Sequence, residues 1–113
     1  MDFSAGVTLR ADHAHLVVTG ELDALTALEV WWQLEDALEQ GCAHFTVDVA
    51  RLAFVDAVGL GVFVRLHNVV SQLDGTMTFV GSSRAFRRAC RLAGLGEAFH
   101  HSAPPPAAVY EPA

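Results

Sequence analysis

The chain has 113 residues, of which 52% are hydrophobic and 18% charged, a balance typical of one globular domain and not of a disordered chain. Its formal net charge is −6 and its seven cationic side chains are all Arg, which argues against the basic surface that nucleic-acid binding needs. No apolar run approaches the roughly 20 residues of a membrane span, and the first residues lack the basic start and apolar stretch of a secretory signal. We therefore expect one cytoplasmic domain that binds neither nucleic acid nor membrane.

Two short strands open the chain. Alternating apolar residues predict strands over 7–11 and 15–19, which pair antiparallel around a turn at Asp12 and His13. Gly20 is expected to close the second strand.

A helix is predicted over residues 24–40, with Asp23 or Thr26 as its N-cap and Gly41 as its end. Its expected core face consists of apolar residues at helical spacing: Ala27, Val30, Leu34, Ala37 and Leu38.

Strands and helices then alternate. In chain order we predict a strand over 44–49, a helix over 57–73, a strand over 76–80, a helix over 84–93 and a short edge strand over 97–101. Ser83 should cap the helix over 84–93 and Gly94 should end it. The helix over 57–73 should bury Phe63, Leu66, Val70 and Leu73.

This order of elements predicts an α/β fold. Right-handed crossovers through the helices imply a parallel core of the sheet, and the opening hairpin adds an antiparallel portion. The expected result is a mixed β-sheet with helices packed against it. All four prolines lie in the last ten residues, so we expect the domain to span 1–101 and to be followed by a Pro-rich flexible C-terminal tail over 102–113.

The segment over residues 54–61 reads Phe-Val-Asp-Ala-Val-Gly-Leu-Gly and lies where the strand pattern changes to the helix pattern. Asp56 occupies the expected N-cap position, where its carboxylate meets the positive end of the helix dipole. Gly59 and Gly61 follow in the first turns, although each costs roughly 1 kcal/mol relative to Ala in a helix. That cost indicates a close backbone approach by a neighbouring element or by a partner.

This segment resembles the signature loop of the STAS domain, the fold of bacterial anti-sigma factor antagonists. Residues 19–23, 48–52 and 93–95 resemble three further segments of that family, in the same order. The resemblance covers about residues 6–101. It implies a STAS fold and a protein-binding role, in which the chain binds an anti-sigma factor of the histidine-kinase-like switch type and so frees a sigma factor for transcription.

In that family a serine follows the loop Asp and is phosphorylated by the partner kinase, which releases the anti-sigma factor. Here the two serine positions hold Ala57 and Val58. The resemblance implies that Asp56, Ala57, Val58, Gly59 and Leu60 contact the partner and that Ala57 is the position of the lost phosphoacceptor. Because phosphorylation needs a hydroxyl, the chain cannot be switched there. It is then either an antagonist that is always on or a copy that keeps only the scaffold.

A second function stays open, in which the chain is a STAS scaffold or a small-ligand sensor subunit of a larger signalling assembly. Some STAS domains serve in stress-sensing complexes or beside transporters. An enzyme is not expected, since no Ser-His-Asp or Cys-His arrangement is suggested by residue order. The six histidines have no helical metal-ligand spacing, and Cys42 and Cys90 are not spaced as a zinc or redox pair. We expect no metal and no cofactor, and we expect both cysteines to be buried.

Two surface features remain. Leu25, Leu28 and Trp32 lie off the core face of the first helix, so they predict an apolar interface for a partner or a second copy, unless Trp32 folds over a neighbouring loop or the opening hairpin. Trp31 should be packed. The last helix carries an arginine stripe, which predicts a solvated face or a docking strip for an acidic partner. The stripe consists of Arg84, Arg87, Arg88 and Arg91.

Overall fold

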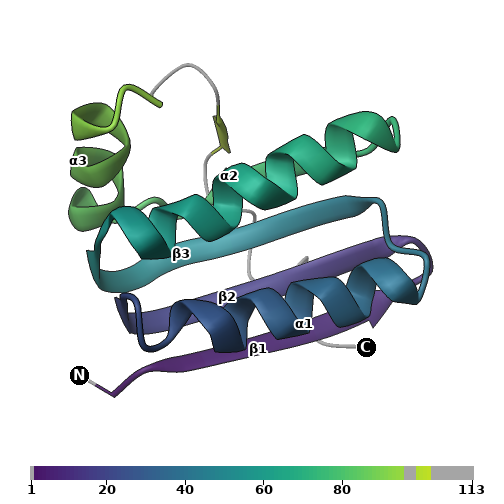
Figure 1. The fold of residues 1–113 in the computed structure, drawn as a ribbon, viewed down its shortest axis with the longest axis horizontal. Helices are drawn as coiled ribbons and strands as arrows, with labels where there is room; N and C mark the ends of the chain where they lie inside the picture. The colour runs from purple at the N-terminus through teal and green to yellow at the C-terminus, as the bar shows by residue number, and fades with distance from the viewer. Residues whose placement is uncertain (1, 96–98, 103–113) are drawn as a thin grey trace.

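A five-stranded mixed sheet forms the centre of the protein, seen here in a computed structural model that describes residues 2–95 and 99–102. The strands are β1 (Ser4–Arg10), β2 (His13–Leu22), β3 (His44–Val55), β4 (Thr76–Val80) and β5 (His100–Ser102). They lie in the sheet in chain order. Figure 1 shows the first three of them, β1, β2 and β3, in that order. β1 and β2 pair antiparallel, whereas β2, β3, β4 and β5 pair parallel. The predicted α/β fold with a mixed sheet is confirmed.

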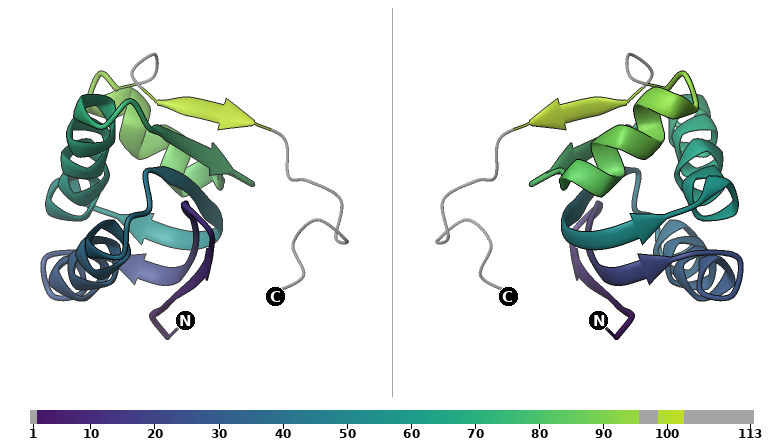
Figure 2. Two further views of the ribbon diagram at one scale, coloured as in Figure 1. Left: turned by 90° about the vertical axis from the view of Figure 1, so that its right-hand side faces the viewer. Right: turned by 90° about the vertical axis from the view of Figure 1, so that its left-hand side faces the viewer.

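The described part of the chain contains three helices: α1 (Ala27–Glu39), α2 (Ala57–Gln72) and α3 (Arg84–Leu92). α1 and α2 lie side by side on one face, and α3 crosses the end of the sheet at which β3 ends (Figures 1 and 2). Within residues 2–95 and 99–102, no helix covers the opposite face. Since β2 and β3 run in the same direction, the two helices that follow them begin at the same end of the molecule.

The core lies between the sheet and its helices. Alternate residues of β2 are buried, and α1 buries Ala27, Val30 and Leu34 as its spacing predicts. Phe79 of β4 stands in the middle of an aromatic cluster, with ring centroids 5.2 Å from Phe63 and 4.7 Å from Phe86. Such pairs contribute about 0.5–1.5 kcal/mol beyond the area that they bury. Phe86 thereby anchors α3 to the rest of the core.

The N-terminal hairpin differs in detail from the prediction. Its turn consists of Ala11 and Asp12, one residue earlier than predicted, with Ala11 at φ 55°. β2 also continues past Gly20 to Leu22. Gly20 has φ +94°, and a Cβ there would lie 2.6 Å from the carbonyl oxygen of Asp2. A glycine is therefore required at this position because the backbone of Asp2 and Phe3 passes close beside it, and Gly20 does not mark the end of the strand.

Most of the other boundaries are close to those predicted, but β3 continues to Val55, six residues past its predicted end. α1 begins at Ala27 and not at residue 24, because Asp23 holds the preceding turn: its Oδ1 accepts hydrogen bonds from the amides of Leu25 and Thr26 at 2.9 and 3.2 Å. Thr26 is the N-cap, but its side chain makes no capping bond. β4 matches its prediction at both ends.

Two expectations near the ends of elements are corrected. Leu73 was expected in the core, but α2 ends at Gln72 and the Leu73 side chain is 53% exposed. The last strand spans His100–Ser102 and not 97–101, so Ser102, predicted as the first residue of the tail over 102–113, belongs to the sheet. Residues 96–98 and the rest of the predicted tail lie outside the described residues.

Candidate partner-binding site

The loop between β3 and α2 is fixed by hydrogen bonds at Asp56. β3 extends to Val55, so the first two residues of the motif are strand and α2 begins at Ala57. The Asp56 amide donates to the carbonyl oxygen of Leu22 at 3.1 Å, which attaches the loop to the end of β2. Its Oδ1 accepts from the amide of Gly59 at 2.8 Å. The predicted N-cap is confirmed.

Beneath the loop, Gly59 and Leu60 are buried. A Cβ on Gly59 would lie 2.5 Å from the carbonyl oxygen of Leu22 and 2.7 Å from its Cγ. The close backbone approach predicted for this glycine is therefore made by the last residue of β2. These two residues support the loop from below.

Ala57 and Val58 form the exposed part of the loop. They lie in the first turn of α2, and Val58 is 55% exposed. Asp56 is half-buried beside them. Neither Ala57 nor Val58 carries a hydroxyl, so the two exposed side chains in the first turn of this helix are apolar.

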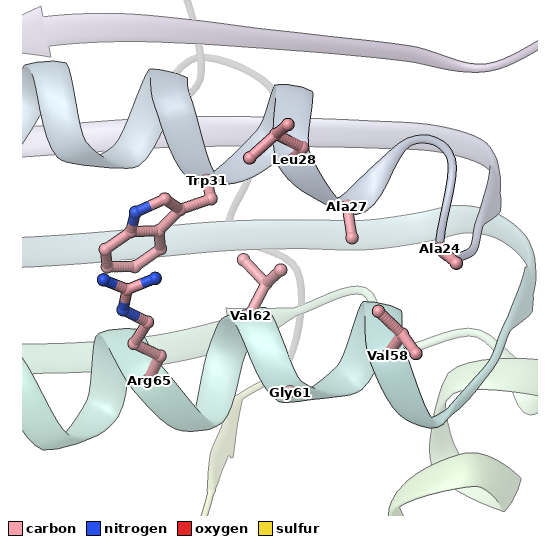
Figure 3. A pocket seen from close by; sticks show the side chains of 8 residues that line it. All are labelled: Ala24, Ala27, Leu28, Trp31, Val58, Gly61, Val62 and Arg65. Carbon is pink, nitrogen blue, oxygen red and sulfur yellow. The ribbon is translucent and has the colours of Figure 1, made fainter.

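A groove that was not predicted runs between α1 and α2 (Figure 3). It has a volume of about 320 Å³. One wall consists of Ala24, in the turn before α1, and of Ala27, Leu28 and Trp31 of α1. The other wall consists of Val58, Gly61, Val62 and Arg65 of α2. No atom lies within 4 Å of where a Cβ on Gly61 would be. Unlike Gly59, Gly61 is therefore not required by any neighbouring element.

Trp31 and Arg65 close one end of this groove. The Arg65 guanidinium carbon lies 4.0 Å from the centroid of the indole ring, a cation–π contact that holds both side chains in place (Figure 3). Trp31 is only 8% exposed, which confirms the prediction that it is packed.

The apolar patch predicted on α1 is on the surface. Leu25 is 89% exposed, Leu28 52% and Trp32 59%, so Trp32 is not packed over a loop or over the hairpin. Leu28 belongs to this patch and also lines the groove. We call Leu25, Leu28 and Trp32 the α1 patch.

The arginine stripe of α3 is exposed along its whole length. Within residues 2–95 and 99–102, none of its side chains lies within ion-pair distance of a carboxylate. Arg87 donates from Nε to the carbonyl oxygen of Ser82 at 3.4 Å. A solvated helix face and a docking strip both fit this arrangement.

A pair of histidines at the opposite end of the sheet was also not predicted. The parallel register places His13 beside His44, and their rings stack with centroids 5.0 Å apart. Asp12 Oδ1 lies 3.1 Å from His13 Nδ1, and His44 Nδ1 lies 2.9 Å from the hydroxyl of Thr76. In the described part of the chain, no three His, Cys, Asp or Glu side chains are placed to hold a metal ion.

Both cysteines are buried and free, as predicted for packing residues. Burial raises the pKa of the Cys90 thiol to about 11. Burial also raises the pKa of Cys42, and the nearby Asp12 carboxylate acts in the same direction.

Among the helices of the described ranges, none combines the length and the apolar character that crossing a membrane requires.

Comparison with known proteins agrees with this geometry. The family model described as "Mlab, STAS domain" matches residues 5–101. The anti-sigma-B factor antagonist of Listeria monocytogenes is 30% identical over 86 residues, which cover 76% of this chain and 75% of the relative. This chain belongs to the STAS family.

Solved structures share the fold. An anti-sigma factor antagonist from Mycobacterium paratuberculosis superposes with a TM-score of 0.76 at 21% identity, covering 93% of this chain and 87% of the other. The anti-sigma factor antagonist SpoIIAA in its unphosphorylated form gives a TM-score of 0.77 at 18% identity, covering 88% of each chain. At these identities the likeness concerns the fold alone.

Proposed function

We propose that this chain is a protein-binding regulator that acts as an anti-sigma factor antagonist. In this role it binds an anti-sigma factor of the histidine-kinase-like switch type and so frees a sigma factor for transcription, in the cytoplasm. The named relative from Listeria monocytogenes, an anti-sigma-B factor antagonist, supports this role. The proposed contact surface is Asp56, Ala57 and Val58, with Gly59 and Leu60 holding it in position.

One observation carries the proposal: an exposed surface at the start of α2 that keeps the capping Asp56 but has no hydroxyl. A phosphate there would add about −1.5 to −2 charges and several acceptor oxygens. Ala57 and Val58 cannot carry it, so binding through this loop is not relieved by phosphorylation of the loop.

Ser83, which follows β4, is an unsuitable substitute for the missing phosphoacceptor. The Ser83 hydroxyl donates to the carbonyl oxygen of Leu52 at 2.7 Å and accepts from the amide of Phe86 at 3.1 Å. Phosphorylation would remove the hydrogen that Ser83 donates to Leu52 and would place negative charge beside that carbonyl oxygen. We therefore propose that the antagonist is always on.

The test is a binding assay against each histidine-kinase-like anti-sigma factor encoded in the source genome, with and without ATP. We expect binding to at least one of them, no loss of binding with ATP, and no phosphate on residues 56–60 by mass spectrometry. If no such protein binds, the proposal is wrong.

Two variants test whether the loop can serve as a kinase substrate once a hydroxyl is restored. Ala57→Ser restores the hydroxyl at an exposed position, and a phosphate at a helix N-terminus is tolerated by free amides and the dipole. We expect phosphorylation of this variant by the bound kinase, followed by release. If only the double variant with Val58→Ser is modified, then Val58 blocks the kinase.

The alternative function, a scaffold or small-ligand sensor subunit, is favoured by one feature, the groove between α1 and α2. Its volume is at the lower end of the roughly 300–1,000 Å³ found for ligand pockets. Neighbouring genes discriminate the two functions, since an antagonist is expected beside a switch kinase or a sigma factor.

A further inference from the structure

The groove between α1 and α2 and the α1 patch form one continuous apolar surface. Val58 belongs to the loop and to the groove, and Leu28 belongs to the groove and to the patch. Apolar side chains therefore extend from the loop across the groove to Leu25 and Trp32. Val58, Leu28, Leu25 and Trp32 are each more than half exposed, whereas Ala27, Trp31 and Val62 are largely buried. Large exposed apolar surfaces on soluble domains mark interaction sites.

We infer that this surface docks an amphipathic helix of a partner protein, with its apolar face in the groove and basic residues flanking that face. The inference deepens the proposed function, because it names the chemistry of the partner segment that the loop alone does not define. Recognition of this kind places apolar anchors at i, i+3 or i+4 and i+7 into a hydrophobic groove.

The shape of the groove fits side chains projecting from a helix. Small residues line both walls, Ala24 and Ala27 on one side and Gly61 on the other (Figure 3). They let another backbone approach closely, while the Trp31–Arg65 contact closes the far end. A volume of about 320 Å³ accommodates a few apolar side chains of the partner.

The charges beside this surface favour a basic occupant. Glu29 precedes Trp32 by three residues on α1 and Glu35 follows it by three, so both carboxylates lie next to Trp32 of the α1 patch on the helix surface. Both are exposed, and within residues 2–95 and 99–102 neither has a cationic side chain within ion-pair distance. Arg65, the cation of the groove, is engaged with Trp31.

The same charges disfavour a second copy as the occupant. Two copies that met through α1 would bring Glu29 and Glu35 of each chain close to those of the other. Like charges across an interface oppose association, whereas complementary charges steer it and fix its register. Lys or Arg residues flanking an apolar helix face provide that complement.

Synthetic peptides test the inference with the full-length protein. The first probe is a helical peptide of roughly 15 residues, long enough to form a helix when bound, with Leu at i, i+3, i+4 and i+7 and Lys at the flanks. The second has Glu in place of Lys, and the third is a scrambled Leu and Lys sequence of the same composition. Each is titrated into the isotope-labelled protein while backbone amide shifts are recorded.

We expect the Leu and Lys helix to shift amides within residues 24–32 and 58–65. The Leu and Glu helix and the scrambled peptide should bind at least about tenfold more weakly, which corresponds to 1.4 kcal/mol. Equal affinity for the Lys and Glu peptides, or shifts confined to other elements, would overturn the inference.

Gly61→Ala is the decisive variant. The added methyl group meets open space, so the fold accepts it, and loss of a helical glycine should raise the melting temperature by roughly 2–8 °C. The same methyl group occupies the groove, so peptide binding should fall at least about tenfold. Ser71→Ala is the matched control, because this exposed residue of α2 does not line the groove. Unchanged peptide binding by Gly61→Ala would refute the inference.

Two further outcomes separate the hypotheses. If the amides of residues 24–32 shift with protein concentration in the absence of peptide, a second copy is the occupant and the inference is wrong. If an anti-sigma factor binds but no Leu and Lys helix does, the proposed function stands and the inference falls. If the Leu and Lys helix binds but no anti-sigma factor does, the inference stands and the proposed function is wrong.

Discussion

The carbonyl oxygen of Leu22 accepts a hydrogen bond from the amide of Asp56 at 3.1 Å. The same oxygen faces Gly59, where an added Cβ would lie 2.5 Å from it. One backbone group at the end of β2 thus determines where the loop begins and how closely α2 packs. The position of Ala57 and Val58 is therefore set by β2 as well as by β3.

Replacing the two loop glycines should have opposite effects on stability. Gly59→Ala places a methyl group against the Leu22 backbone, and overpacking of this kind costs roughly 1–3 kcal/mol. Gly61→Ala removes a glycine from a helix without a clash and should stabilise the protein by about 0.5–1 kcal/mol. Urea denaturation measures both, and changes of the same sign would contradict the geometry described for Gly59.

Removing the cap at Asp56 should destabilise the protein. Asp56→Ala leaves the Gly59 amide without its acceptor, and loss of such a cap costs about 0.5–2 kcal/mol. Asp56→Asn keeps a capping oxygen and should retain most of that stability. Thermal unfolding of the two variants distinguishes capping from a purely electrostatic role, in which Asn would behave like Ala.

Substitutions of the two adjacent tryptophans should have different effects: one should lower stability and the other should weaken binding. Trp31→Ala removes a buried side chain and the cation–π contact with Arg65, so we expect a loss of roughly 3–5 kcal/mol of stability. Trp32→Ala should cost less than about 1 kcal/mol of stability but should weaken partner binding by more than about 1 kcal/mol. Chemical denaturation combined with the binding assay checks both, and a large loss of stability in Trp32→Ala would show that Trp32 is packed.

Cys90 should make stability depend on pH in the alkaline range. Burial raises the pKa of its thiol from the ordinary value of 9.0 to about 11. Below pH 9 both the folded and the unfolded thiol are protonated, and this contribution to stability is fully present. As pH rises from 9 toward 11, only the unfolded state releases its proton, so stability falls.

Cys90→Ala, with no thiol to titrate, isolates that contribution. Its stability should change less than that of the wild type between pH 8 and pH 10.5, as measured by urea denaturation at a series of pH values within the roughly 9–11 window. Parallel pH profiles for the two proteins would show that the thiol does not titrate differently on folding.

The elements that have clear local signals at both ends were predicted best from the sequence. β4 is bounded by Gly75 and Gly81 and matches its prediction. Asp56 and Ser83 were recognised as caps because each lies directly before a helical pattern. The extension of β3 through residues 50–55 was missed because burial in that part of the strand departs from strict alternation.

The site was harder to predict because it depends on contacts between distant segments. The groove arises where α1 and α2 lie side by side, and no local pattern shows that Ala27 and Gly61 line the same space. The stacking of His13 on His44 likewise follows from the register of two parallel strands. What the sequence does provide is Gly61 itself, a helical glycine that no internal contact explains.

The arrangement of the five strands in chain order bears on how the protein folds. Each strand pairs with the strand that precedes it in the chain, so no strand has to insert between two that are already joined. The cost of closing each connection grows only slowly with its length. Among the described residues, the first connection is a turn and each later one contains one helix. The sheet can therefore grow from the β1–β2 hairpin toward β5 in the direction of synthesis, and the loop at Asp56 is completed as soon as β3 has joined β2.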